Sequence, residues 1–192
     1  MARTQAFDRD TVVRAARTVF WEHGYDGASI PELEEATGIR RSSLYNTFGS
    51  KRGLFDEAVQ SYLDEVIRPR LRPFKADPVA PDALTDYLTG LWDAFGNLDS
   101  MPATNGCLLV NTARESIAHD SAVAQLVAEY RAELASAMRR GVHAQRPASL
   151  ATQTDDLAEN IVALVIAAFA LARVDSTQAR HNLTLALRLA HD

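Results

Sequence analysis

The stretch ASIPELEEATGIRRSSLYNTFGSK, residues 28–51, carries the turn and capping signals on which the fold assignment depends. Ser29 and Glu32 have the S-x-x-E spacing of a capping box, in which each residue bonds to the backbone N–H of the other. Pro31 suits the first turn of a helix, because an N–H at that position has no partner. The stretch therefore begins with a short helix, and Gly38 ends it.

A second short helix is predicted from about residue 40 to residue 46, and longer helices flank the pair. Before the pair, DRDTVVRAARTVFWEHG at 8–24 repeats apolar residues every three or four positions, with Asp8 as its N-cap and Gly24 as its stop. After the pair, Ser50 caps a longer helix over 51–67. Two short helices joined by a glycine turn between longer helices predict a helix-turn-helix.

This motif places its second helix in the major groove of DNA, while the flanking elements contact phosphates. Residues 36–55 contain four Lys or Arg residues and no acid, which suits a polyanionic partner. Arginine pairs with guanine through two hydrogen bonds, and hydroxyl and amide groups bind phosphate oxygens. The predicted DNA-binding residues are Ser29, Arg40, Arg41, Ser42, Ser43, Tyr45, Asn46, Thr47 and Lys51. Arg3 is expected in an N-terminal arm that reaches the DNA backbone.

Four apolar residues of the stretch are expected to form the small core that locks the two short helices together. They are Leu33, Ile39, Leu44 and Phe48.

Composition limits the remaining classes of function. The 192 residues are 47% hydrophobic, enough for a sizeable core, and the single cysteine, Cys107, excludes an internal disulfide. MARTQAFDRD at the N-terminus has no apolar signal core. The longest apolar run, 161–172, has twelve residues, whereas a membrane span needs about 20. We expect a soluble cytoplasmic protein with no membrane segment, metal site or cofactor.

The formal net charge of -5 hides an asymmetry. Residues 1–55 have eight Lys or Arg residues and seven acids, or +1, whereas residues 56–192 have twelve and eighteen, or -6. The positive charge is thus concentrated around the two short helices.

The rest of the chain also has helical periodicity, so the predicted fold class is all-α. The helix over 51–67 is expected to stop before Pro69, and the four prolines within 69–81 predict a connection to a larger body. Gly141 is interpreted as a helix stop. The further predicted helices cover 82–98, 107–119, 121–140, 154–173 and 177–191, with a break over 99–106. We assign an N-terminal three-helix helix-turn-helix DNA-binding domain to 1–55 and a C-terminal helical ligand-binding and dimerisation domain to 56–192.

Several motifs in residues 8–60 resemble the DNA-binding domain of the tetracycline-repressor-like (TetR/AcrR) family of transcriptional regulators. They are HGYDGAS at 23–29, LY-x-x-F at 44–48 and SK-x-x-LF at 50–55. The resemblance implies an all-helical homodimer whose divergent C-terminal body binds a small ligand and changes the spacing of two DNA-binding domains. It also implies repression as the usual mode of action. The two recognition helices of a dimer would read a pseudo-palindromic operator.

One residue departs from the family pattern. The family usually has a small residue after the apolar one in the first helix of the pair, and here Glu34 follows Leu33. Either the local packing leaves room for the glutamate side chain, or the helix pair is tilted differently.

NGCLLVNTARES at 105–116 resembles a segment of one subgroup of this family. If a helix begins at Asn105 or Gly106, Cys107 lies in its first turn, where the helix dipole favours a thiolate and a reaction with electrophiles or oxidants. The alternative is that Cys107 is a small buried hydrophobe beside Leu108 and Leu109.

A small-molecule effector is expected to bind among the helices of the body, in an apolar pocket with few polar groups. The candidate ligand residues are Tyr62, Leu88, Trp92, Phe95, Met101, Cys107, Leu109 and Tyr130, each of which could equally be plain core. Because the run at 161–172 is apolar around its whole circumference, a partner subunit is expected to cover it. The predicted homodimer interface therefore combines the helices near 154–173 and 177–191.

Two other classes of function are the alternatives to a DNA-binding regulator. The acids Asp155, Asp156 and Glu159 cluster at a predicted helix start, where they stabilise the dipole without catalysis, and no catalytic triad or phosphate loop is present, so we expect no enzyme. The second is a helix-turn-helix-derived protein-interaction module without DNA binding, which the overall acidity favours.

Overall fold

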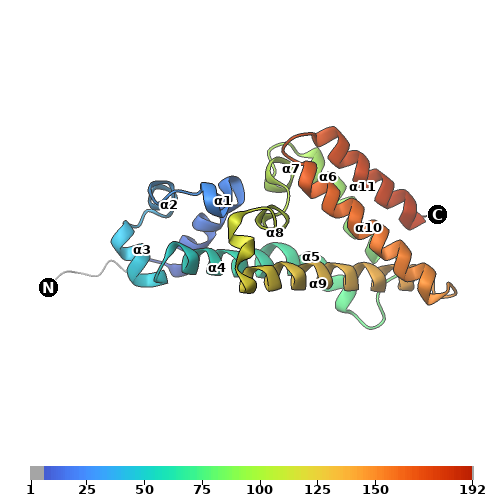
Figure 1. Ribbon diagram of the computed structural model, residues 1–192. Coiled ribbons are helices and arrows are strands. Elements are labelled where there is room, and N and C mark those ends of the chain that lie inside the picture. The colour runs from blue at the N-terminus through green and yellow to red at the C-terminus, as the bar shows by residue number, and fades with distance from the viewer. Residues whose placement is uncertain (1–6, 192) are drawn as a thin grey trace.

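A computed structural model describes residues 7–191 and shows helices and turns over this range, with no β-strand in it. The predicted all-α class is confirmed. In chain order the helices are α1 (Arg9–Gly27), α2 (Ile30–Thr37), α3 (Arg41–Phe48), α4 (Lys51–Tyr62), a π-helical turn (Leu63–Ile67), α5 (Arg68–Leu71), a 3₁₀ turn (Arg72–Lys75), α6 (Ala83–Gly96), α7 (Met101–Asn105), α8 (Leu108–Thr112), a 3₁₀ turn (Ser116–His119), α9 (Ser121–Gln145), α10 (Ala151–Leu171) and α11 (Ser176–His191). The molecule is elongated, with α2 and α3 towards one end and α10 and α11 towards the other (Figure 1).

The ends of α1 follow from local signals in the sequence. The carboxylate of Asp8 accepts a hydrogen bond from Thr11 N at 3.2 Å, as an N-cap does. Gly24 interrupts the helical backbone with φ at 74° and ψ at 175°, a conformation that glycine adopts without strain. The predicted start is confirmed, whereas the predicted stop at Gly24 is a kink inside α1, which continues to Gly27.

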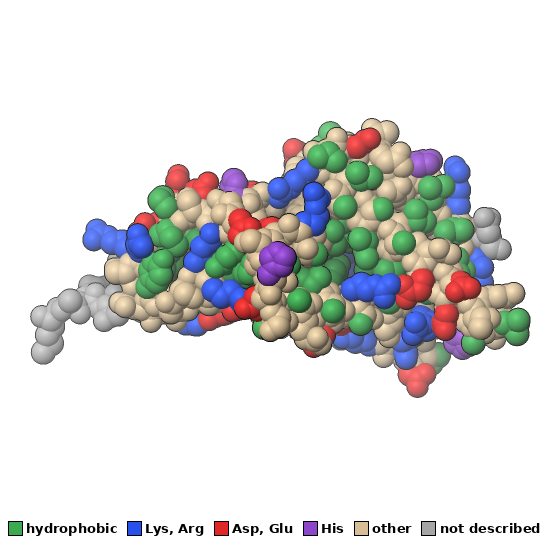
Figure 2. All heavy atoms as spheres, viewed as in Figure 1, with side chains coloured by type: hydrophobic (Ala, Val, Ile, Leu, Met, Phe, Trp, Pro, Cys, Tyr) green, Lys and Arg blue, Asp and Glu red, His purple; other side chains and the backbone are tan. Residues whose placement is uncertain are grey.

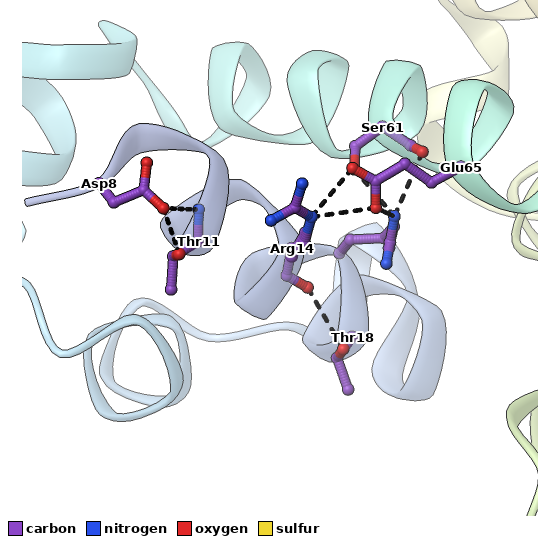
Figure 3. Close-up of polar contacts among 7 residues, drawn as sticks. Asp8, Thr11, Arg14, Thr18, Ser61 and Glu65 are labelled. Carbon is purple, nitrogen blue, oxygen red and sulfur yellow. Dashed lines mark hydrogen bonds and ion pairs between the residues drawn. The ribbon is translucent and has the colours of Figure 1, made fainter.

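Helix α1 packs along α4 through aromatic and ionic contacts. The Phe20 and Phe55 rings meet edge to face with centroids 5.2 Å apart, and both side chains are buried. On the surface, Glu65 accepts hydrogen bonds from Arg14 and from Arg17 at 2.9 and 2.8 Å (Figure 3). These contacts fix α1 against the long helical segment that leads into the body.

The expectation that this segment stops before Pro69 is wrong. A π-helical turn at Leu63–Ile67 lets Arg68 N bond to Leu63 O, five residues back, and α5 then carries the chain on to Leu71. Because Pro69 sits in the first turn of α5, its missing N–H interrupts no regular hydrogen bond. The connection to the body is consequently shorter than predicted.

Three other helix boundaries in the body need correction. The predicted break at 99–106 contains the short helix α7, which Ser100 caps by accepting from Ala103 N. The predicted helix over 107–119 is divided into α8 and the 3₁₀ turn Ser116–His119. Helix α9 passes through Gly141, whose missing Cβ leaves room for the Phe74 ring: a Cβ there would lie 2.7 Å from it.

The body and the N-terminal helices share one continuous core. Trp21 Nε1 donates to the carbonyl of Gly106 at 3.1 Å, and Arg173 donates to the carbonyl of Trp21 at 2.7 Å. Asp26 accepts from the hydroxyl of Ser116 at 2.7 Å. The predicted domain boundary after residue 55 falls inside α4, so the two assigned domains share this helix. Within residues 7–191, none of the helices has the length and apolar character that crossing a bilayer requires.

Candidate nucleic-acid interface

The capping box at the start of α2 is present in both directions. Glu32 N donates to the Ser29 hydroxyl at 3.3 Å, and the Glu32 carboxylate accepts from Ser29 N at 2.8 Å. Hydrogen bonds from the Ser29 hydroxyl and backbone N–H lower the pKa of Glu32. Ser29 therefore serves α2 locally, and its contact with DNA stays a prediction.

The turn between α2 and α3 depends on Gly38. Its φ of 69° lies in the left-handed region, and its N–H donates to the carbonyl of Glu34 at 2.9 Å. Helix α3 starts at Arg41, with Arg40 as the N-cap residue, and runs to Phe48, one residue later at its start and two residues later at its end than predicted. The helix-turn-helix is thus formed with a slightly shifted second helix.

The expected small core of this motif is also present. Leu33, Leu44 and Phe48 are buried, and Ile39 is half-buried against them. Because Leu44 and Phe48 are four residues apart, they turn one side of α3 inward and leave the opposite side to solvent.

That solvent face of α3 carries most of the predicted DNA contacts. Arg40, Arg41, Ser42, Tyr45 and Asn46 are exposed, whereas Ser43 and Thr47 are half-buried. The Arg41 guanidinium lies 5.4 Å from the centroid of the Tyr45 ring. Lys and Arg side chains gather at the end of the molecule where α3 lies (Figure 2). The exposed members of the predicted set at α3 therefore lie on its solvent side.

The four bases of the acid-free window divide into two groups. Arg52 forms ion pairs with Asp56 at 2.7 Å and with Asp120, the residue that caps α9, at 3.1 Å. Across residues 7–191, no carboxylate lies within ion-pair distance of the guanidinium groups of Arg40 and Arg41 or of the Lys51 ammonium group. These three bases are the ones available to a polyanion.

Lys51 is held at the start of α4 beside the helix pair. Its ammonium group lies 4.7 Å from the centroid of the Tyr25 ring, which fixes the side chain without neutralising it. Ser50 caps the same helix by accepting from Gly53 N at 3.0 Å. Arg3 lies outside the described residues.

Glu34, whose place the sequence left open, bonds across the turn. Its carboxylate accepts from the backbone N–H of Arg41 at 2.5 Å. Local packing thus accommodates the glutamate side chain, the first of the two alternatives raised by the family pattern.

The body contains a small, partly open cavity of about 20 Å³ between α4, α6 and α9. Three tyrosines line it: Tyr62 and Tyr130, which were predicted, and Tyr87, which was not. Burial raises the pKa of all three phenols, so each hydroxyl stays neutral and able to donate. Gly106, which follows α7, and Phe169 of α10 are also part of its lining.

Cys107 lies next to this cavity rather than in the first turn of a helix. It is the N-cap residue of α8, its side chain is buried, and its thiol donates to the Tyr130 hydroxyl at 3.5 Å. The predicted position in a first turn is wrong, because α8 begins one residue later, at Leu108.

The other ligand candidates do not line the cavity. Trp92 donates to the Thr184 hydroxyl at 3.2 Å, and Phe95 packs against Phe169 with ring centroids 5.8 Å apart. Leu109 faces a separate surface cleft beside Arg52. Leu88 is fully buried in the core, and Met101 begins α7. A larger open cleft of about 730 Å³ between the 77–81 loop and the start of α10 contains none of the candidates.

Tyr87 was missed because only its tertiary neighbours distinguish it from an ordinary helix residue. It lies one turn before Leu91 on the inner face of α6, and its ring packs against Phe74 at 5.7 Å.

The apolar helix α10 is covered only partly by its own chain. Ile161, Val165 and Phe169 are buried, but Ala163 is exposed and Ala167 is half-exposed. The face containing Ala163 and Ala167 continues towards Val174, which is 79% exposed.

The chain is similar to several bacterial regulatory proteins. The family model for bacterial regulatory proteins of the tetR family matches residues 12–58. The HTH-type transcriptional regulator YezE of Bacillus subtilis, itself uncharacterised, is 32% identical over 142 residues, which cover 74% of this chain and 72% of YezE. The HTH-type transcriptional repressor ComR of Escherichia coli is 34% identical over 110 residues, 57% of this chain and 51% of ComR.

Two solved structures have the same architecture. A cysteine mutant of the TetR family transcriptional regulator CifR, complexed with 26-bp double-strand operator DNA, has a TM-score of 0.79 and 32% identity, with 98% of each chain covered. A TetR transcriptional regulator from Chloroflexus aurantiacus has a TM-score of 0.74 and 28% identity, with 95% of this chain and 92% of that chain covered. The helix-turn-helix, the helical body and these relatives agree, and the chain belongs to the TetR family of bacterial regulatory proteins.

Proposed function

We propose that the chain is a DNA-binding transcriptional repressor that releases a pseudo-palindromic operator when a small molecule or an electrophile acts on its C-terminal domain. The observation that carries the proposal is the solvent face of α3, where Arg40 and Arg41 are exposed and their guanidinium groups form no ion pair with a carboxylate among residues 7–191. The chain's similarity to the transcriptional repressor ComR and to the operator-bound regulator CifR supports the proposal. Since bacterial DNA lies in the cytoplasm, the protein acts there.

The proposed contacts follow the geometry of the motif. Arg40, Arg41, Ser42 and Ser43 lie at or near the start of α3, the end that meets base edges when such a helix enters the major groove. Tyr45, Asn46 and Thr47 follow one turn later, and Lys51 begins the next helix, where phosphate contacts are expected. Ser29 at the start of α2 is a further proposed phosphate contact.

The two kinds of contact predict different effects of substitution. Lys51→Ala should weaken binding to every duplex about fivefold and lower the dependence of log affinity on log salt by about one unit, because one phosphate contact is lost. Arg41→Ala should instead change the preferred sequence, since an arginine–guanine pair contributes about 1–3 kcal/mol of discrimination. Fluorescence anisotropy with random duplexes and with duplexes selected from a randomised pool measures both.

Lys75→Ala is the matched control, because it removes the same charge from a residue that is ion-paired with Glu133 in the body. It should leave DNA affinity nearly unchanged. Identical behaviour of the Lys51 and Arg41 variants would show that the assigned roles are wrong. If the wild-type protein binds no duplex even at low salt, the result would favour the alternative function, a protein-interaction module without DNA binding.

We propose a homodimer through α10 and α11, because the half-exposed apolar face around Ala167 needs a cover. Two copies would present two α3 helices to the two halves of one operator. Ala167→Glu should convert the dimer to a monomer in sedimentation at micromolar concentration. Ala128→Glu, at an exposed position of α9, should leave the dimer intact. A wild-type monomer at this concentration would contradict the proposed interface.

We propose that the effector acts at the cavity lined by Tyr62, Tyr87 and Tyr130. Its volume of about 20 Å³ has room for about one water molecule. A larger ligand therefore has to separate the surrounding helices, which connects binding to movement. Cys107 is the alternative site at which an electrophile would act. Because its thiol contacts Tyr130, which lines the cavity, an electrophile would reach the thiol through the cavity.

A further inference from the structure

Helix α3 begins without a cap from its own N-cap residue. Arg40 has an extended backbone, and its side chain makes no capping hydrogen bond. The first backbone N–H groups of a helix have no partner inside the helix, so something else has to bind them. Here the Glu34 carboxylate, from the middle of α2, accepts from Arg41 N at 2.5 Å. The cap of α3 is therefore provided by the preceding helix.

Glu34 holds both sides of the turn through different atoms. Its backbone carbonyl accepts from Gly38 N at 2.9 Å and ends α2, while its side chain begins α3. Because one residue fixes the end of one helix and the start of the next, it also limits how far α3 can rotate or slide relative to α2. The half-buried side chain is itself held against the protein rather than extended into solvent.

The same contact places a negative charge where the motif is otherwise most attractive to DNA. The N-terminus of a helix favours anions, because its N–H groups and its dipole point outward. In this chain a carboxylate of the protein occupies that position, beside the exposed bases Arg40 and Arg41. The Glu34 carboxylate repels a phosphate that approaches the start of α3, because both groups are negatively charged. It does not repel the edge of a base in this way, because the base carries no net charge.

We propose that Glu34 is a positioning and specificity-determining residue for DNA recognition. Its hydrogen bond to Arg41 N fixes the orientation of α3, and its charge lowers the affinity for DNA regardless of sequence. This inference rests on the proposed DNA-binding function. The two effects are separable, since glutamine keeps an oxygen acceptor and removes the charge, and alanine removes both.

The charge is tested by comparing Glu34→Gln with Glu35→Gln. Both variants remove one negative charge from the same helix, but Glu35 is exposed and makes no side-chain hydrogen bond or ion pair with residues 7–191. Glu34→Gln should raise affinity for a random-sequence duplex about fivefold at low salt, with a smaller gain at high salt, as expected for one charge near a phosphate. Glu35→Gln should change it less than twofold. Equal effects of the two variants would overturn the role of the charge.

The clamp is tested first without DNA, by hydrogen exchange of the Arg41 amide in the full-length protein. Glu34→Ala should speed this exchange about tenfold relative to wild type, whereas Glu34→Gln should keep it within about threefold. Thermal unfolding of both variants establishes that they are folded. Unchanged exchange in Glu34→Ala would overturn the clamp whether or not the protein binds DNA, which separates this failure from a failure of the proposed function.

Sequence selection from a randomised duplex pool gives the functional result. Glu34→Ala should recover a broader set of sequences than wild type, because α3 is no longer held in one orientation, and Glu34→Gln should recover the wild-type motif with less enrichment over random DNA. If Glu34→Ala selects the wild-type motif with wild-type enrichment, Glu34 does not determine specificity. Failure of the wild-type protein to enrich any sequence would overturn the proposed function, and this inference with it.

Discussion

Replacing Gly53 with alanine is expected to lower affinity for the preferred operator about 50-fold, the loss of one or two base contacts, and to lower the free energy of unfolding by about 3 kcal/mol. Gly53 lies in the first turn of α4, directly against the end of α3. A Cβ at this position would lie 2.1 Å from the carbonyl oxygen of Phe48 and 3.2 Å from its carbonyl carbon. Both are backbone atoms, so no side-chain rotation relieves the overlap.

The overlap has to be relieved by moving α3 away from α4. Phe48 is buried in the small core beneath α3, so a shift of its backbone also disturbs that packing. The displacement needed is about 1 Å, which is enough to lengthen the hydrogen bonds that Arg40 and Arg41 are proposed to make with bases. Loss of affinity and loss of stability therefore have the same cause.

Gly90→Ala is the matched control for this substitution. Gly90 also lies inside a helix, α6, but nothing is found within 4 Å of a Cβ placed there. The change should raise the free energy of unfolding by about 0.5–1 kcal/mol, because alanine loses less conformational entropy than glycine in a helix. Urea denaturation and DNA titration compare the two variants. A Gly53→Ala protein with wild-type stability would mean that α3 and α4 adjust freely, contrary to the packing described.

The features predicted correctly from the sequence depend on residues close together in the chain. The capping box of Ser29 and Glu32, the cap at Asp8 and the break at Gly24 each involve hydrogen bonds over three or four residues. Such bonds are decided by residue type and spacing, so the pattern is sufficient to find them. The surface of α3 follows from the same periodicity, once Leu44 and Phe48 are placed inside.

The incorrect predictions concern residues whose role depends on distant parts of the chain. Gly141 looks like a helix stop, but it permits the close approach of Phe74 and Leu84. Pro69 looks like a helix breaker, but the preceding π-helical turn accommodates it within α5. Both residues do tend to end helices, but here tertiary packing at Gly141 and an altered hydrogen-bond register at Pro69 let the helix continue.

The candidate sites also separate into features that local sequence predicts and features that depend on distant residues. The predicted DNA-contacting residues lie on adjacent turns of one motif, so the sequence locates them. The cavity in the body is lined from helices far apart in the chain, from α4 to α10, and only Tyr62 and Tyr130 of the eight ligand candidates reach it. The cap that Glu34 gives to α3 crosses a turn between two helices, and spacing alone could not distinguish it from a change in tilt.

Trp21 connects the DNA-binding end of the molecule to this cavity. Its indole N–H donates to the buried carbonyl of Gly106 at 3.1 Å, and its ring meets the Tyr62 ring edge to face at 4.8 Å. Both Gly106 and Tyr62 line the cavity, whereas Trp21 belongs to α1. A ligand that displaces either wall therefore presses on the helix that supports α2 and α3.

Trp21→Phe should lower the free energy of unfolding by about 2–3 kcal/mol, measured by urea denaturation. Phenylalanine keeps a ring against Tyr62 but has no N–H, so the Gly106 carbonyl loses this donor in a region closed to water. The smaller ring also leaves a space, since the Trp21 side chain is 5% exposed.

Trp92→Phe provides the comparison, because its indole also donates a hydrogen bond, to the Thr184 hydroxyl at 3.2 Å. Trp92 is half-buried and far from α1 in the chain, and water can replace its N–H. The Thr184 hydroxyl also keeps its own hydrogen bond to the carbonyl of Arg180. This variant should lose about 1 kcal/mol or less. If the two variants lost the same free energy of unfolding, the hydrogen bond from Trp21 to Gly106 would contribute no more than the solvent-accessible one from Trp92. Trp21 would then not support the proposed connection between the cavity and α1.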